Sequence, residues 1–292
     1  MKILILGVNG MLGHKLYQVL SPEFDVTGTI RGHYSDVRQY NVFNEQRIIT
    51  GINAQNILTI KKVIAETKPD VVINCIGIIK QIKESHDKQL AIWVNSLFPH
   101  QLQQICSEHG ARLIHMSTDC VFSGEKGNYR EDDPSDAEDI YGKSKYLGEI
   151  DEKNTLTIRT SLIGRELRTS NSLLEWFIAQ RGKEINGFTR AIFSGFPTLH
   201  MARIIRDVIV NYPALSGIYH ISSEPISKYE LLSLVNKKMG LQIKISPYND
   251  FHCDRSLDST RYREKTHFKP MPWDDMITEL AQDTATHYQW RN

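Results

Sequence analysis

Two side chains able to move a proton lie four residues apart in the segment Tyr141-Gly142-Lys143-Ser144-Lys145. If this segment begins a helix, Tyr141 and Lys145 lie on one face of it. The Lys145 ammonium is then expected to lower the pKa of the Tyr141 phenol, so that the pair can exchange a proton with a carbonyl oxygen near neutral pH. Taken alone, this spacing is common and is better explained by an ordinary surface pair.

A hydroxyl side chain follows an apolar run of strand length. Residues 111-116 (ARLIHM) lead directly into Ser117, Thr118 and Asp119. Ligands of open α/β sheets bind at the carboxyl ends of the strands. We therefore expect Thr118 to hydrogen-bond the same carbonyl oxygen that Tyr141 protonates.

A glycine-rich turn lies between the first expected strand and the first expected helix. Glycine allows unusual backbone angles, and it lets main-chain N–H groups approach a pyrophosphate at the positive end of a helix. A tight turn without a ligand is the alternative, but the turn opens a βαβ unit, which favours a dinucleotide site. The candidate contacts are Gly7, Asn9, Gly10, Met11, Leu12 and Gly13.

The end of the second expected strand bears on the choice of dinucleotide. NAD sites of this type carry a carboxylate there to bind the ribose 2′-hydroxyl. This chain instead has Arg31, while Asp25 lies too early in the strand. A guanidinium can bind a 2′-phosphate, so the sequence favours NADPH over NADH. A solvated loop arginine is the alternative.

These groups must be positioned by alternating strands and helices. Short loops between the elements predict an α/β fold, a Rossmann-like doubly wound parallel sheet over residues 1-164. The pattern loosens after about residue 165, which predicts a smaller, largely C-terminal lobe over 165-292, while segment 197-222 is expected to return to the main domain. The expected strands are 2-6, 25-30, 70-75, 111-116 and 155-159, and the expected helices are 11-20, 57-67, 89-109 and one from about 141.

Composition narrows the function classes. Lys and Arg number 35 against 34 Asp and Glu, so there is no basic field for nucleic acid or an anionic membrane. The four cysteines and eleven histidines show no ligand spacing, which argues against a metal site. The apolar opening MKILILG is too short to cross a bilayer. We expect a cytoplasmic protein with free thiols.

In their order along the chain, the glycine turn, the Ser/Thr after the fourth main strand and Tyr-x-x-x-Lys resemble the extended short-chain dehydrogenases/reductases. Further segments resemble the dTDP-4-dehydrorhamnose reductase family within that group. The resemblance implies NADPH-dependent reduction of the C4 ketone of a nucleotide-linked 6-deoxy-4-hexulose in surface polysaccharide precursor synthesis. The matching segments are 117-124, Tyr129, Glu131, 133-134, 141-145, 148-149 and 158-161, with a fainter match over 253-259.

The resemblance also implies roles for individual residues. Tyr141 is the acid, Lys145 tunes it and holds the nicotinamide ribose, and Thr118 positions the ketone. Asn95 matches an asparagine that supports this lysine, although an ordinary helix-surface Asn is the alternative. Arg255 is a candidate for binding the substrate diphosphate. Cys75 and Gly77 complete the expected cofactor contacts, and Ile79, Asp119, Cys120, Val121 and Leu162 complete the expected substrate contacts.

Some residues differ from those usual in the family. These differences bear on which sugar is the substrate and leave the predicted reduction unchanged. Cys120 stands where these reductases usually carry Tyr, Leu162 replaces an aromatic residue, and segment 74-80 replaces an Ala-rich turn followed by Tyr-Thr. A UDP-linked N-acetylated 4-ketosugar is therefore an alternative substrate. An epimerase or 4,6-dehydratase of the same fold, or a non-catalytic NADP-binding regulatory protein, is the alternative function. A homodimer is compatible with the sequence.

Overall fold

The central sheet of the protein, described here from a computed structural model that covers residues 1–80 and 87–291, has seven parallel strands. Their order is β10-β6-β5-β4-β1-β2-β3, and all six neighbouring pairs run parallel. The predicted doubly wound parallel sheet is confirmed. The strands are β1 (Lys2–Leu6), β2 (Asp25–Thr29), β3 (Ile48–Ile49), β4 (Val71–Asn74), β5 (Arg112–Met116), β6 (Thr155–Arg159) and β10 (Gly217–His220).

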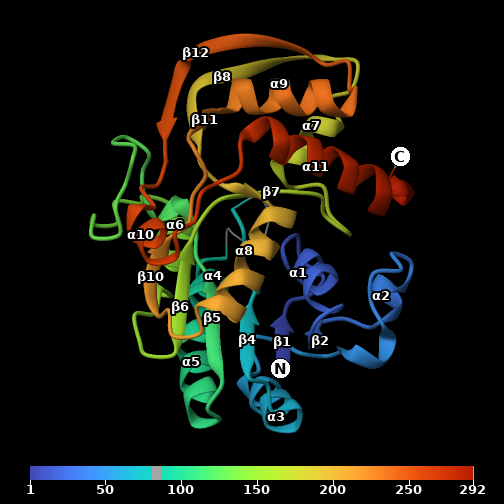
Figure 1. Ribbon diagram of the computed structural model, residues 1–292, viewed down its shortest axis with the longest axis vertical. Helices are drawn as coiled ribbons and strands as arrows, with labels where there is room; N and C mark the ends of the chain where they lie inside the picture. Colours follow the sequence, from blue (N-terminus) through green and yellow to red (C-terminus); the bar gives the residue numbers. More distant parts are fainter. Residues whose placement is uncertain (81–86, 292) are drawn as a thin grey trace.

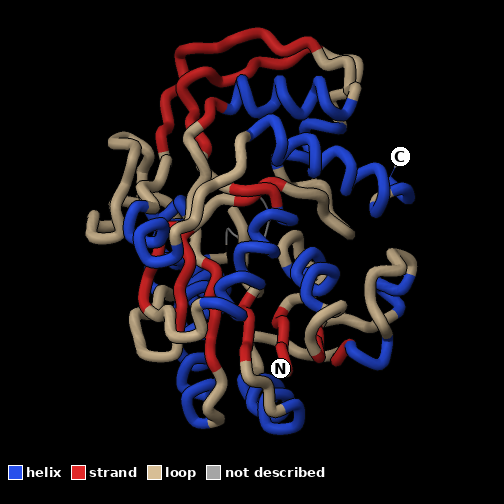
Figure 2. The backbone as a smooth tube through the Cα atoms, viewed as in Figure 1, coloured by secondary structure: helices blue, strands red, loops and turns tan. Residues whose placement is uncertain are grey.

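Helices cover both faces of this sheet (Figures 1 and 2). Successive residues of a strand point to opposite faces, and β1 illustrates the result. Ile3 and Ile5 pack in the core that contains α1 (Gly13–Leu20) and α8 (Thr198–Asn211). Leu4 and Leu6 pack in the second core, with α3 (Ile57–Thr67) and α5 (Phe98–Glu108). The continuous apolar run KILIL is thus the mark of a strand buried on both sides.

The helix predicted over residues 89-109 is interrupted. It consists of α4 (Lys88–Ile92), the π-helical turn η3 (Trp93–Leu97) and α5. Periodicity cannot show such a turn, because one wide turn changes the apolar pattern little. π-helical turns are frequent at functional sites. This one carries Asn95, which is only 1% exposed.

Several short elements were not expected from the sequence. They include α2 (Ser35–Arg38), η1 (Glu45–Arg47), η4 (Asp119–Val121) and η5 (Gln289–Arg291), besides β3. The helix expected from about residue 141 is α6 (Ile140–Leu147). Its first turn is capped by Asp139, whose carboxylate accepts a hydrogen bond from the Gly142 amide at 2.8 Å.

A second lobe lies over the carboxyl ends of the main strands (Figure 1). Its three-stranded sheet has the order β11-β8-β12. Strand β10 pairs with β6 and helix α8 contacts α1, so this part of segment 197-222 lies in the main domain. The lobe contains β7 (Leu162–Ile163), α7 (Leu173–Ile178), β8 (Glu184–Phe193), β9 (Phe196–Pro197), β11 (Ile226–Ser227), α9 (Lys228–Met239), β12 (Lys244–Asp254) and α11 (Trp273–His287), whereas α10 (Thr260–Thr266) contacts β10 of the central sheet.

Buried polar contacts join the C-terminal helix to the first helix of the main domain. Lys15, which is 1% exposed, binds both carboxylate oxygens of Asp283 at 2.8 Å. His14 Nδ1 donates to the Gly10 carbonyl oxygen, and His14 Nε2 therefore accepts from the Tyr288 hydroxyl at 2.5 Å. The C-terminal segment thus packs directly behind the glycine turn.

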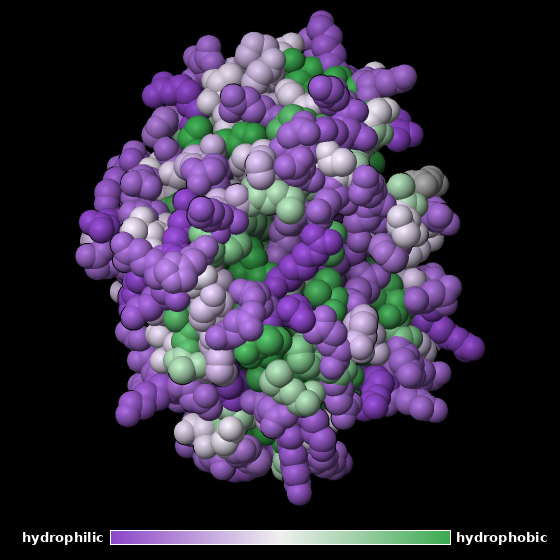
Figure 3. Space-filling model, viewed as in Figure 1, coloured by the Kyte–Doolittle hydropathy of each residue, from purple (hydrophilic) through white to green (hydrophobic). Residues whose placement is uncertain are grey.

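Polar side chains dominate the surface seen in Figure 3, and the apolar groups on that face are scattered. Within the part of the chain that the structure describes, no helix combines the length and apolarity needed to span a bilayer.

Candidate active site

The glycine turn brings two backbone segments into unusually close contact. Gly7 has a φ of +77°, a conformation that side chains disfavour. A Cβ at Gly13 would lie 2.3 Å from the Gly7 carbonyl oxygen, so a side chain there would require the backbone to move. The turn also holds Asn9, Gly10, Met11 and Leu12 and leads directly into α1. This geometry fits a main-chain cradle for a pyrophosphate.

The loop after β4 closes against this turn. A Cβ at Gly7 would lie 3.0 Å from Ile76 Cγ1. The Cys75 carbonyl carbon would lie 3.4 Å from the same Cβ, so Cys75 lies next to the glycine turn, whereas Gly77 lies beside Asn95 Oδ1. Burial raises the pKa of the Cys75 thiol to about 12, although the Lys145 charge opposes this rise. Ile79, at the end of the described part of this loop, is 36% exposed.

Asn95 ties the loop after β4 to helix α6. Its Oδ1 accepts from the Ile78 amide at 2.9 Å, and its Nδ2 donates to the Ile78 carbonyl oxygen at 3.0 Å. The same Nδ2 donates to Ser144 Oγ at 3.1 Å. Asn95 thus binds the residue of α6 that directly precedes Lys145. The interpretation of Asn95 as an ordinary helix-surface residue is wrong because the side chain is buried.

Thr118, Tyr141 and Lys145 come together at the carboxyl end of β5. Lys145 Nζ donates to the Met116 carbonyl oxygen at 2.6 Å, and the Thr118 hydroxyl, which donates to Asp119 Oδ1 at 3.2 Å, lies close enough to the Tyr141 phenol to affect its pKa. Close backbone packing makes this possible. A Cβ at Gly142 would lie 2.1 Å from the Cys120 carbonyl oxygen, so only glycine lets α6 approach η4 this closely. Gly142, which lies within the Tyr-x-x-x-Lys motif, is therefore a residue of the site that was not predicted from the sequence.

The pKa of Tyr141 differs from the expectation. Burial raises it, and the neighbouring Cys120 and Asp119 add to the rise, while the hydrogen bond with Thr118 opposes it. The expectation that Lys145 lowers the pKa of Tyr141 is wrong. The loss of solvent around the buried phenol has a larger effect than the neighbouring groups of the chain, and it raises this pKa. Burial likewise lowers the pKa of Lys145 to about 8, opposed by Glu149 and Cys75. At neutral pH the phenol keeps its proton and Lys145 is an ammonium.

The expected substrate contacts after Thr118 differ in exposure. Thr118 Oγ1 accepts from the Cys120 amide at 3.1 Å, which starts the η4 turn. Burial raises the pKa of the Cys120 thiol to about 12, so Cys120 is poorly suited to act as a nucleophile. Asp119 is 8% exposed, and burial raises its pKa while Arg255 opposes the rise. Val121 is fully buried in a core cluster with Phe122, Tyr129 and Leu257.

Arg255 reaches this site from the second lobe. It follows β12, and its Nε donates to the Phe122 carbonyl oxygen at 2.7 Å. Its charge acts on Cys120 and Asp119. Within residues 1–80 and 87–291, the other guanidinium nitrogens make no hydrogen bond. Leu162 lies in β7 and packs against the main core with only part of its surface exposed.

Arg31 stands at the end of β2 in an exposed position. Its side chain forms no ion pair or hydrogen bond with the rest of the described chain. The guanidinium is therefore available to an anionic ligand at the strand end that faces the adenosine ribose in folds of this type.

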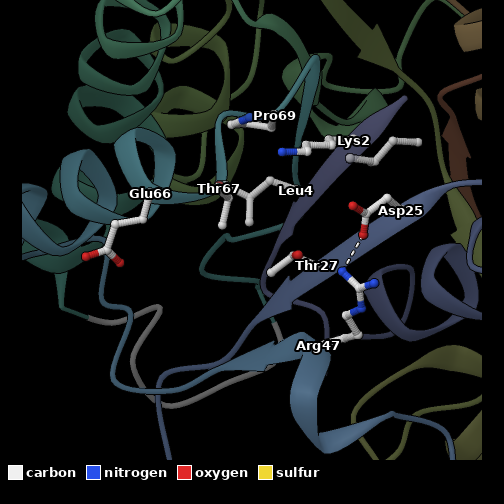
Figure 4. Close-up of a pocket in the computed structure, with 9 residues that line it drawn as sticks. Lys2, Leu4, Asp25, Thr27, Arg47, Glu66, Thr67 and Pro69 are labelled. Atoms are coloured by element: carbon white, nitrogen blue, oxygen red, sulfur yellow. Dashed lines mark hydrogen bonds and ion pairs between the residues drawn. The ribbon is translucent and has the colours of Figure 1, made fainter.

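A surface cleft of about 210 Å³ lies elsewhere, at the amino ends of β1 and β2. Figure 4 shows Lys2, Leu4 and Thr27 among its lining residues and the ion pair between Arg47 and Asp25. The reacting groups described above lie at the opposite, carboxyl ends of the strands. This cleft is therefore separate from the candidate active site.

Comparisons with known proteins agree with this geometry. A family model described as RmlD substrate binding domain matches residues 1–286. The chain is 27% identical over 301 residues to the spore coat polysaccharide biosynthesis protein SpsK of Bacillus subtilis (strain 168), with 98% of each chain covered. A dTDP-4-dehydrorhamnose reductase of Streptomyces griseus is 32% identical over 148 residues, 50% of this chain and 43% of that protein.

The fold is also similar to solved structures. A dTDP-4-dehydrorhamnose reductase from Bacillus anthracis str. Ames, solved in complex with NADP, superimposes with a TM-score of 0.79. The alignment covers 97% of this chain and 99% of that chain at 22% identity. At this identity the likeness establishes the fold.

Proposed function

The chain belongs to the RmlD substrate binding domain family, and from this premise we propose that it is an NADPH-dependent reductase of the C4 ketone of a nucleotide-linked 6-deoxy-4-hexulose. The convergence of Thr118, Tyr141 and Lys145 at the carboxyl end of β5 carries the proposal. The activity of the dTDP-4-dehydrorhamnose reductase relatives supports the reaction. The role of the Bacillus subtilis relative in spore coat polysaccharide biosynthesis supports a place in surface polysaccharide precursor synthesis.

The residues of the site fit NADPH. The backbone of the turn from Gly7 to Gly13 is suited to the pyrophosphate, because neither position leaves room for a side chain. The unpaired guanidinium of Arg31 is suited to the 2′-phosphate, and Lys145 to the nicotinamide ribose. When bound, NADPH supplies the hydride. The negative 2′-phosphate of NADPH is attracted by the positive Arg31, whereas it would be repelled by the carboxylate that an NAD site carries.

The chain's own residues handle the proton and the orientation of the ketone. Tyr141 keeps its proton at neutral pH and so can donate it to the carbonyl oxygen as negative charge develops there. Thr118 Oγ1 hydrogen-bonds the same oxygen and limits its movement. The Lys145 ammonium stabilises the phenolate that remains on Tyr141.

The second lobe supplies the contacts for the nucleotide sugar in this proposal. Arg255 suits the diphosphate, since its outer nitrogens are unoccupied by the described chain and its Nε is fixed on Phe122. Cys120 and Leu162 replace bulkier residues at the sugar, which leaves a dTDP-linked sugar and a UDP-linked N-acetylated sugar as candidates. A 4,6-dehydratase needs an acid after Asp119, and the Cys120 thiol, with a pKa of about 12, does not supply one.

The experiment is an assay of NADPH consumption with dTDP-, UDP- and GDP-linked 4-ketosugars. Tyr141→Phe should lower turnover by about 10²- to 10⁴-fold, the usual effect of a positioned acid, and leave NADPH binding intact. Tyr146→Phe is the matched control, because this tyrosine lies on the same helix but is 43% exposed. Near-normal turnover of Tyr141→Phe would rule out the proposed mechanism, as would NADPH binding without reduction of any of these sugars.

We further propose that the protein is a cytoplasmic homodimer. Support for the dimer comes from large apolar side chains exposed on η3 and α6, two elements that contact each other. These side chains are Trp93, Leu97, Tyr146 and Leu147. Sedimentation equilibrium should give twice the mass of the chain, and a monomer at micromolar concentration would exclude the dimer.

A further inference from the structure

A buried ion pair lies directly behind the reacting groups. Glu149 and Arg159 are 2% and 3% exposed. The guanidinium donates to both carboxylate oxygens, from Nε at 2.8 Å and from a terminal nitrogen at 2.7 Å. Removing two charges from water costs about as much as their attraction returns, so such a pair is weak evidence for stability. Its position relative to Thr118 and Lys145 indicates another role.

The pair holds the end of the strand that carries Thr118. Ser117 precedes Thr118, and its hydroxyl donates to Glu149 Oε1 at 2.5 Å. Its amide donates to the Ile158 carbonyl oxygen of β6 at 2.7 Å. Ser117 is thus fixed by both its side chain and its backbone. This leaves little freedom for Thr118, whose hydroxyl must reach the ketone.

Besides its hydrogen bond with Ser117, Glu149 acts on Lys145 through its charge, which opposes the lowering of the Lys145 pKa by burial. Glu149 follows Lys145 by four residues, just after the end of α6. Cys75, after β4, has a pKa of about 12 and is uncharged at neutral pH. His115, on β5, is neutral because burial and the Lys145 charge both lower its pKa, and Tyr141 on α6 is also neutral. Among these neighbours of Lys145, Glu149 is the acidic side chain that is held by Arg159 in an ion pair.

Arg159 extends the same network toward the substrate side. It donates to His220 Nε2 at 3.2 Å and to the Glu131 carbonyl oxygen at 3.3 Å. Its guanidinium lies 5.3 Å from the centre of the Phe122 ring. The Phe122 carbonyl oxygen in turn accepts from Arg255. One ion pair thus contacts the elements that present Thr118 and Arg255.

We propose that Glu149 is a positioning residue of the reduction, which fixes Thr118 through Ser117 and faces the Lys145 ammonium with the negative charge that Arg159 holds in place. This inference rests on the proposed function, since it assigns Glu149 a part in that reaction.

The test compares pH profiles of turnover and of NADPH affinity. In the unmodified protein both should fall on the alkaline side near pH 8, where Lys145 loses its proton. Glu149→Gln removes the anion and should move this midpoint to lower pH by about one unit, the scale expected for a nearby opposite charge. Arg159→Met leaves the carboxylate and should not lower the midpoint. An unchanged midpoint in Glu149→Gln, or an equal downward shift in both variants, would overturn the proposal.

Ser117→Ala covers the case in which Glu149→Gln does not fold, because it keeps the ion pair. It should lower turnover about tenfold, the cost of one hydrogen bond to a charged group, with the alkaline midpoint unchanged. Full turnover in Ser117→Ala would refute the link to Thr118. Glu152→Gln, which changes an exposed carboxylate three residues further on, is the matched control and should have no effect.

The two readouts separate this inference from the proposed function. If the protein binds NADPH but reduces no 4-ketosugar, the proposed function fails, while the pH dependence of NADPH affinity still tests the charge that Glu149 presents to Lys145. If the sugar is reduced and the Glu149→Gln midpoint does not move, the proposed function stands and the positioning role is refuted.

Discussion

Replacing Lys145 with Met should make the protein more stable and less active. Lys145 is 5% exposed, and burial lowers its pKa from the ordinary value of 10.5 to about 8. A lysine with a lowered pKa in the folded state is a cost wherever it carries its proton. Methionine has a similar length and carries no charge, so it removes that cost.

The magnitude follows from the change in pKa. One pKa unit corresponds to about 1.4 kcal/mol, so the ammonium costs about 3 kcal/mol at pH 7, below both values. Loss of the hydrogen bond to the Met116 carbonyl oxygen offsets about 1 kcal/mol of the stability that is gained by removing the ammonium. The net gain in the free energy of unfolding is about 2 kcal/mol, or about 4 °C in Tm for a chain of this size.

The sign of the pH dependence distinguishes this cause from others. The cost of the ammonium is fully present below pH 8, decreases between pH 8 and 10.5, and is absent above that range. The stability advantage of Lys145→Met should therefore be largest at pH 7 and nearly gone at pH 10. Denaturant unfolding of both proteins at pH 7, 8.5 and 10 measures it directly. Turnover and NADPH affinity of the variant should both fall.

Lys15→Met is the matched control, because burial lowers the pKa of Lys15 as well, but Lys15 forms an ion pair with Asp283 that opposes this effect. Its removal leaves Asp283, 9% exposed, without its ion-pair partner, and should destabilise the protein by about 3 kcal/mol. If Lys145→Met were less stable than the unmodified protein at pH 7, or if its advantage did not change with pH, burial of a charged Lys145 would not be the cause and the reasoning would fail.

The remaining predictions concern the cofactor and the reaction. Arg31→Ala should reduce the preference for NADPH over NADH by about 1 to 3 kcal/mol, the range for charge-assisted hydrogen bonds. If calorimetry gave equal affinities of the unmodified protein for NADPH and NADH, Arg31 would not bind the 2′-phosphate. Gly13→Ala should weaken NADPH binding at least about tenfold, because its Cβ would lie 2.3 Å from the Gly7 carbonyl oxygen; unchanged affinity would show that the turn is no cradle. Incubation with UDP-glucose, dTDP-glucose or UDP-N-acetylglucosamine should give no 4-keto-6-deoxy product by mass spectrometry, since Cys120 replaces the acid that a dehydratase needs, and the appearance of one would favour a dehydratase.

The sequence was sufficient to predict five of the seven strands of the main sheet and the helices between them, but not the short strand β3. Apolar runs such as KILIL and helical spacings such as that after Gly13 are local patterns, and a buried parallel strand and an amphipathic helix require little else. The glycine turn and Tyr-x-x-x-Lys are also local, because their function depends on residues within one turn. The π-helical turn at Trp93–Leu97 left no such pattern.

Tertiary structure decided the electrostatics of the site and its distant members. Spacing alone made Lys145 the main influence on Tyr141, but burial proved larger, and burial depends on the whole fold rather than on neighbours in sequence. Arg255 joins the site from the far end of the chain only because β12 ends beside Phe122. Glu149, Arg159 and Ser117 meet because the chain after α6 lies against the carboxyl ends of the parallel strands β5 and β6. The sequence by itself determined which groups can do the chemistry, whereas packing determined their protonation and their partners, because desolvation and through-space contacts arise only once the chain is folded.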